Sequence, residues 1–252
     1  MDWVQVLILS VVEGVTEFLP ISSTGHLILA SKLLGVAQTE FVKSFEIVIQ
    51  LGAIAAVAWE SKEAFRSFKS VKAMMWAFVP TGVIGFGLYR VVKTYLLGNA
   101  EVVVWALLLG GVGMIIWEKL QTRDRKLQIS ELNIKQAVLI GVLQAVSVIP
   151  GVSRALMTIM GGMMMGLSRI EAVKFSFVLA IPTMVAATGL DLVKSGWSFT
   201  ANEWLILGAG FVGAYFSAWV VVRWLIGYVQ KHNFISFGIY RIVLALVFGL
   251  LI

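Results

Sequence analysis

A polar interruption near the amino terminus reads Glu13-Gly14-Val15-Thr16-Glu17-Phe18-Leu19-Pro20-Ile21-Ser22-Ser23-Thr24-Gly25-His26. It lies within an otherwise apolar stretch, Val4–Leu34, which as one continuous helix would be about 46 Å long. That length exceeds the roughly 30 Å hydrocarbon core of a bilayer. We therefore expect a helix that enters the bilayer, a polar break, and a shorter helix that returns to the same side. A kinked span followed by a surface helix is the alternative.

A second apolar stretch, Ile134–Gly166, is interrupted in the same way by Pro150-Gly151-Val152-Ser153. Non-helical backbone at membrane depth is tolerated only where it is buried in protein or lines a wet cavity. Two such breaks in one chain therefore predict a polar site inside the bilayer.

The composition indicates an all-α integral membrane protein. Of the 252 residues, 59% are hydrophobic and 13% are charged, whereas soluble domains have about 45–50% apolar and about 25% charged residues. No polar linker divides the chain, so we expect residues 1–252 to form one polytopic membrane domain. Besides the two re-entrant hairpins, six transmembrane helices are expected at about Phe45–Trp59, Ala73–Val92, Val102–Trp117, Val173–Leu192, Trp204–Leu225 and Ile235–Ile252.

The net charge of +6 comes from basic residues that lie in short loops between the apolar segments. They therefore indicate orientation in the membrane, and no nucleic-acid partner is expected. Most of these bases face the cytoplasm if both termini lie outside it, which is the predicted orientation. The chain has no cysteine, which excludes disulfides, thiolate zinc sites and cysteine nucleophiles.

The chain also resembles itself. Gly14-Val15-Thr16-Glu17, followed by Pro20 and Ser23, is similar to Gly141-Val142-Leu143-Gln144, followed by Pro150 and Ser153. Repeat one is expected at about residues 1–120 and repeat two at about 130–252. Each half would hold one re-entrant hairpin and three spans, so the second half would be inserted upside down. Such an inverted repeat would bring the two breaks together near the midplane.

Ionisable residues within apolar segments are costly and indicate function. Glu13 and Glu17 are four residues apart and share one helix face. Like charges at this spacing repel, so at depth they persist only if one is protonated or a cation lies between them. Hard oxygen ligands of this kind suit Mg²⁺ or Ca²⁺. A structural pair satisfied by neighbouring hydroxyl groups is the alternative.

The second break contributes Arg154, whose guanidinium suits the geometry of a phosphate group. Helix starts at Ser23 and near Ser153 would present free amides, which also attract anions. These features predict a metal-assisted phosphate site, although Arg154 could instead form a structural ion pair with Glu13 or Glu17. Gln50 could line the same cavity. Gln144, at the repeat position of Glu17, is expected to make a structural hydrogen bond, and Arg241 to snorkel or pair structurally.

Residues 13–26, together with Pro150-Gly151-Val152-Ser153-Arg154, resemble the two signature motifs of the bacterial undecaprenyl-pyrophosphate phosphatases, also called bacitracin-resistance proteins. The resemblance spans nearly the whole chain. It implies hydrolysis of undecaprenyl diphosphate to undecaprenyl phosphate, carrier recycling for peptidoglycan synthesis, and bacitracin resistance. It also implies a Mg²⁺ or Ca²⁺ requirement, a plasma-membrane site opening to the outer face, contacts with bilayer lipids, and homodimers.

Carried over by motif, the expected catalytic residues are Glu13, Glu17, Ser23, His26 and Arg154, with Glu13 and Glu17 as metal ligands. The expected substrate-binding residues are Ser22, Thr24, Gly25, Gly151, Ser153, Thr158 and Gln50. The second motif of the family usually continues Ser-Arg-Ser-Gly-x-Thr, whereas here Ala155-Leu156-Met157-Thr158 follows Arg154. This departure puts in doubt the local shape of the loop and the rate of hydrolysis, more than the type of reaction that the family resemblance implies.

Three questions stay open at this point. The nucleophile could be Ser23, His26 or water. The protein could instead be an inverted-repeat transporter or flippase for an anionic lipid phosphate. The Ala155-Leu156 departure also leaves room for a weakened paralogue that binds bacitracin or lipid.

Overall fold

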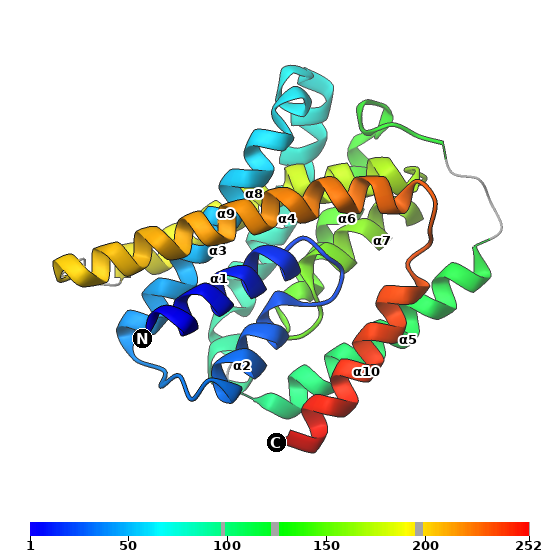
Figure 1. Ribbon diagram of the computed structural model, residues 1–252. Helices are drawn as coiled ribbons and strands as arrows, with labels where there is room; N and C mark the ends of the chain where they lie inside the picture. Colours follow the sequence, from blue (N-terminus) through cyan, green and yellow to red (C-terminus); the bar gives the residue numbers. More distant parts are fainter. Residues whose placement is uncertain (97–98, 122–125, 195–198, 252) are drawn as a thin grey trace.

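The computed structural model describes residues 1–96, 99–121, 126–194 and 199–251 of the chain (Figure 1). Over these residues the fold is a bundle of α-helices. In chain order these are α1 (Trp3–Thr16), α2 (Ser23–Leu33), α3 (Glu40–Glu60), α4 (Phe68–Val91), α5 (Ala100–Leu120), α6 (Ile134–Ala145), α7 (Arg154–Met164), α8 (Arg169–Lys194), α9 (Ala201–Val229) and α10 (Ile235–Leu251).

The prediction of an all-α membrane protein is confirmed by the length and composition of the helices. Among the described residues, α3, α4, α5, α8 and α9 each hold a segment long and apolar enough to cross a membrane. The sixth predicted span forms α10, which has 17 residues and would be about 25 Å long. Helices α1, α2, α6 and α7 have between 11 and 14 residues each and are too short to cross alone.

Both predicted interruptions are present. Helix α1 ends at Thr16 and α2 begins at Ser23, and the intervening residues, 17–22, are the first break. Helix α6 ends at Ala145, a 3₁₀ turn follows over Val146–Val148, and α7 begins at Arg154. We call residues 149–153 the second break. Within each hairpin the two helices pack against each other.

The two breaks end in the same unusual conformation. Ser22 and Ser153, the N-cap residues of α2 and α7, have φ angles of 73° and 76°. Positive φ is uncommon for residues other than glycine. Each serine hydroxyl accepts a hydrogen bond from a backbone amide of the helix that it caps. Ser22 therefore corresponds to Ser153, and the predicted pairing of Ser23 with Ser153 is wrong by one residue. One residue separates Pro20 from its N-cap serine, whereas two residues separate Pro150 from its own.

Matching glycines set the packing of α1 and α6. A Cβ atom on Gly14 would lie 2.5 Å from the Ala214 carbonyl oxygen of α9, and one on Gly141 would lie 1.9 Å from the Ala77 carbonyl oxygen of α4. Only glycine permits such close approach. Helix α1 thus packs on α9 and α6 packs on α4, while α5 and α10 run side by side at one edge of the bundle (Figure 1).

Candidate active site

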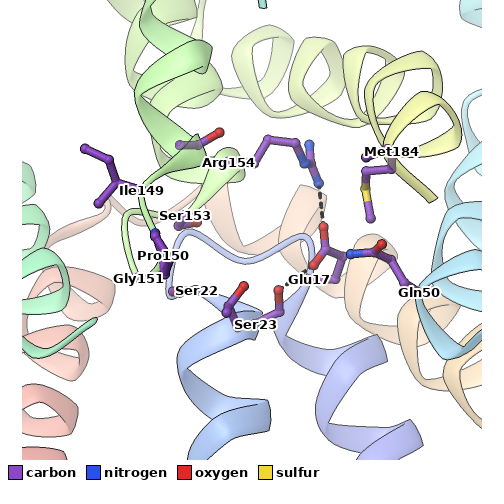
Figure 2. A pocket seen from close by; sticks show the side chains of 13 residues that line it. Glu17, Ser22, Ser23, Gln50, Ile149, Pro150, Gly151, Ser153, Arg154 and Met184 are labelled. Carbon is purple, nitrogen blue, oxygen red and sulfur yellow. Dashed lines mark hydrogen bonds and ion pairs between the residues drawn. The ribbon is translucent and has the colours of Figure 1, made fainter. Parts of the chain in front are cut away.

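A cavity of about 230 Å³ lies where the two breaks meet. It is lined by Glu17, Ser22, Ser23 and Thr24 from the first hairpin, by Ser147, Ile149, Pro150, Gly151, Ser153 and Arg154 from the second, and by Gln50, Met184 and Ala187 (Figure 2). Pockets that enclose a whole ligand have about 300–1,000 Å³. This cavity is therefore sized for a head group.

The structure brings eight of the predicted site residues to this cavity: Glu17, Ser22, Ser23, Thr24, Gln50, Gly151, Ser153 and Arg154. They come from the two halves of the sequence. Gln50 reaches the cavity from the middle of α3, one of the spans. The convergence of the two breaks, which the sequence predicted, is thus present in the fold.

Glu17 connects the two breaks directly. Its Oε1 accepts a hydrogen bond from Arg154 Nη2 at 3.2 Å, and its Oε2 accepts one from Ser23 Oγ at 2.5 Å (Figure 2). The Glu17 side chain is 6% exposed and that of Arg154 is 11% exposed. A carboxylate, a hydroxyl and a guanidinium therefore lie together at one small, largely buried site. The ion pair that the sequence left as an alternative for Arg154 is present, and it lies in the cavity wall.

One guanidinium nitrogen of Arg154 has no hydrogen-bond acceptor among the described residues. Its Nη1 donates to the Ser176 carbonyl oxygen at 3.1 Å, while the buried Nε has no acceptor among the described residues. Thr158, a predicted substrate-binding residue, lies outside the cavity and is fully buried. Its hydroxyl donates to the Arg154 carbonyl oxygen at 2.9 Å and lies 2.6 Å from Ser176 Oγ. Thr158 therefore supports the first turn of α7 and does not line the cavity.

Glu13 lies on α1 one turn before Glu17, is 1% exposed, and is not among the residues that line the cavity. Neither of its carboxylate oxygens has a hydrogen-bond donor among the described residues. Burial of a bare carboxylate is very costly unless it is protonated or paired with a cation. The residues present fit a divalent cation: Mg²⁺ is commonly held by one or two carboxylates plus substrate phosphates. No group of three or more His, Cys, Asp or Glu side chains with metal-binding spacing occurs in the described part of the chain.

His26 is not brought to the cavity. Its Nδ1 lies 2.7 Å from the Ser22 carbonyl oxygen and its Nε2 lies 2.7 Å from the Tyr240 hydroxyl. The two rings stack, with centroids 5.5 Å apart. Both ring nitrogens thus have partners that tie α2 to α10. Gly25 also lies outside the cavity, against Val103 and Leu107 of α5.

The Ala155-Leu156 departure leaves the start of α7 intact. Both side chains are buried in the core, and the Leu156 amide donates to Ser153 Oγ at 3.2 Å. The sequence interpretation missed Ser147 and Met184 as lining residues and Tyr240 as the partner of His26. A hydroxyl inside the second interrupted stretch could have pointed to Ser147. Nothing in the pattern around Met184 or Tyr240 distinguishes either from an ordinary span residue.

These features define a class: a helical membrane protein whose two broken hairpins enclose a small site for an anionic group. The chain belongs to the bacitracin resistance protein BacA family, whose model matches residues 6–247. An undecaprenyl-diphosphatase of Aquifex aeolicus (strain VF5) is 49% identical, covering 98% of this chain and 97% of that protein. One of Sulfurihydrogenibium sp. (strain YO3AOP1) is 45% identical, with 99% of each chain covered. One of Persephonella marina (strain DSM 14350 / EX-H1) is 43% identical over the full length of both chains.

Proposed function

We propose that this protein is a membrane phosphatase that hydrolyses undecaprenyl diphosphate to undecaprenyl phosphate and inorganic phosphate. Water is added across the phosphoric anhydride bond, and the lipid carrier is returned for peptidoglycan synthesis. Family membership and full-length relatives named undecaprenyl-diphosphatase support the activity. Bacitracin resistance is associated with the family. The single observation that carries the assignment to this site is Glu17, which holds Ser23 and Arg154 in one cavity.

Ser23 is the nucleophile that the geometry supports. Its hydroxyl already donates to Glu17 Oε2, so the carboxylate is placed to accept the proton as Oγ attacks the terminal phosphorus. The bond between that phosphorus and the bridging oxygen breaks, and undecaprenyl phosphate leaves with the electron pair. Water then attacks the phosphoserine, inorganic phosphate departs, and Ser23 regains its proton. His26 has partners at both ring nitrogens and lies outside the cavity, which disfavours a phosphohistidine.

Arg154 binds the anionic head group in this proposal. Phosphate oxygens compete with Glu17 for the guanidinium. Because Glu17 and Arg154 are largely buried, fixed charge aimed at the transferring group is worth more than in bulk water. Glu13 and Glu17 would hold a divalent cation, Mg²⁺ or Ca²⁺, which when bound would neutralise part of the diphosphate charge.

The fold is proposed to be an inverted repeat of two re-entrant hairpins and six spans. Its support is the matching Ser22 and Ser153 caps, the matching Gly14 and Gly141 crossings, and the packing of α1 on α9 and of α6 on α4. In this proposal both termini lie outside the cytoplasm, and the site is reached from the outer face of the plasma membrane, in contact with bilayer lipids. A homodimer is expected from the family resemblance. Because the chain lacks cysteine, single introduced cysteines and a membrane-impermeant thiol reagent can test the topology.

The experiment that tests the function measures phosphate release from undecaprenyl diphosphate by purified protein in detergent. Detergent solution has no two compartments, so turnover there cannot be transport. Glu17→Gln and Arg154→Ala should each lower the rate by at least about 100-fold, because the first removes the proton acceptor for Ser23 and the second removes the cation that binds the phosphate. Glu60→Gln is the matched control, because Glu60 pairs with Arg223 outside the cavity. Rates within a few-fold of wild type for both site variants would contradict the proposal.

A further inference from the structure

Arg241, in the first half of α10, is a fully buried guanidinium with no carboxylate partner among the described residues. It is surrounded instead by backbone carbonyl oxygens. Arg241 Nε donates to Leu107 at 3.3 Å, Nη1 to Pro20 at 3.3 Å, and Nη2 to Ala106 at 2.9 Å and to Gly151 at 3.0 Å. Hydrogen bonds from a charged donor are about twice as strong as neutral ones. A buried charge satisfied only by main-chain groups therefore fixes the segments that supply them.

Two of these carbonyl groups occupy equivalent positions in the two breaks. Pro20 lies two residues before the N-cap Ser22, and Gly151 lies two residues before the N-cap Ser153. Arg241 therefore holds the equivalent carbonyl of each break. The other two acceptors belong to α5, the helix that runs beside α10 (Figure 1). One guanidinium thus ties both breaks to the same helix pair.

Two neighbouring features strengthen this arrangement. The preceding residue, Tyr240, contacts His26, whose other ring nitrogen contacts the Ser22 carbonyl oxygen, so α10 contacts the first break at a second point. Gly110 of α5 leaves the space that the guanidinium occupies. A Cβ atom at Gly110 would lie 2.3 Å from Arg241 Nη2. By contrast, a Cβ atom at Gly113, on the same helix, would meet nothing within 4 Å.

We propose that Arg241 is a positioning residue, which aligns the two breaks so that Glu17 and Ser23 face Arg154. It lines no part of the cavity and acts through the Pro20 and Gly151 carbonyls. The planar guanidinium donates in several fixed directions at once, whereas a lysine ammonium is a single compact charge. Lysine at this position would keep the charge and lose the link between the breaks. This inference rests on the proposed phosphatase function.

The test compares Arg241→Lys and Gly110→Ala with the control Gly113→Ala, all as full-length protein in detergent. A misplacement of about 1 Å at a reacting centre can lower a rate by about 100-fold. We expect Arg241→Lys to lower kcat by about 30- to 100-fold and Gly110→Ala to lower it by about 10-fold, with KM changed less than about 3-fold. Gly113→Ala should stay within about 2-fold of wild type on both constants. Gly110→Ala retains the arginine, so it keeps the test valid if Arg241→Lys does not fold.

A double-mutant cycle separates alignment from general stability. If Arg241 acts by aligning Arg154 with Glu17, then adding Arg241→Lys to Arg154→Lys should lower kcat by less than about 3-fold further. Full additivity would overturn the proposal. So would a lower melting temperature with kcat per folded molecule unchanged in Arg241→Lys and Gly110→Ala. If wild-type protein releases no phosphate, the phosphatase function fails separately. Binding of inorganic phosphate then tests Arg241: about 10-fold weaker binding by Arg241→Lys supports alignment, and equal binding overturns it.

Discussion

The two breaks have the same backbone conformation at their N-cap residues and carry different side chains after it. Each ends in an N-cap serine with positive φ, and each serine side chain closes the first turn of the following helix. The first helical residue after this cap is Ser23 in one break and Arg154 in the other. A common framework thus presents a hydroxyl from one side of the cavity and a cation from the other, so the site needs both breaks.

The residues that lead into the two breaks also differ in their charged side chains. Relative to the matching glycines Gly14 and Gly141, the first hairpin carries Glu13 and Glu17 where the second carries Ile140 and Gln144. Gln144 is fully buried, and its Nε2 donates to the hydroxyls of Thr81 at 2.8 Å and Thr183 at 3.2 Å. The predicted structural hydrogen bond of Gln144 is confirmed. The carboxylates therefore belong to the first hairpin alone, and the second supplies a neutral, structural amide at the corresponding position.

The largest effect is expected from exchanging these two side chains. Glu17→Gln should lower phosphate release by about 1,000-fold, because it removes both the proton acceptor for Ser23 and the partner of Arg154. Adding Gln144→Glu should not restore activity, since Gln144 binds Thr81 and Thr183 and does not line the cavity. The measurement is the rate in detergent for both single variants and the double variant. Recovery to within about 10-fold of wild type in the double variant would mean that the breaks are interchangeable.

A second prediction concerns the carboxylate that has no counterpart in α6. Chelation of divalent cations should abolish phosphate release by the wild type, and added Mg²⁺ or Ca²⁺ should restore it. Glu13→Gln should raise the cation concentration for half-maximal activity by about 10- to 100-fold, because no described residue donates a hydrogen bond to the Glu13 carboxylate. Glu60→Gln, in an ion pair outside the cavity, should leave it unchanged. Full activity of the wild type after chelation would exclude this role for Glu13.

How far sequence could predict this site depends on the kind of interaction. Both interruptions were predictable, because proline and hydroxyl residues at membrane depth mark a broken helix. The meeting of Glu17 with Arg154 was predictable too, since ionisable groups in an apolar bundle need partners. The register of the two N-cap serines was not predictable, because the second break has one more residue between its proline and its N-cap serine than the first. The partners of Arg241 were not predictable either. They are main-chain carbonyl groups of distant segments, and the pattern of side chains in the sequence does not indicate them.

Replacing His26 should lower the rate of phosphate release much less than replacing Ser23. His26→Gln should lower the rate by no more than about 10-fold, because this side chain joins Ser22 to Tyr240 and does not reach the reacting phosphate. Ser23→Ala should lower it by about 1,000-fold. Acid quenching during turnover of radiolabelled substrate, followed by peptide mapping, should locate the label on Ser23. Label on His26, or a loss in His26→Gln as large as in Ser23→Ala, would reverse the assignment of the nucleophile.

The smallest effects test whether the two breaks are equally strained. A non-glycine residue held at positive φ costs about 1–3 kcal/mol, whereas replacing an N-cap serine by glycine costs only a few tenths. Glycine also loses more backbone freedom on folding, about 0.5–1 kcal/mol. Ser22→Gly and Ser153→Gly should therefore each stabilise the protein by up to about 1 kcal/mol, seen as a rise of about 2–4 °C in melting temperature. Ser22→Ala and Ser153→Ala lose the cap and retain Cβ, so both should lower it. If both serines are strained to the same extent, both glycine variants should change the melting temperature in the same direction. A rise for one variant and a fall for the other would show that the strain differs between the two breaks, although their φ angles are alike.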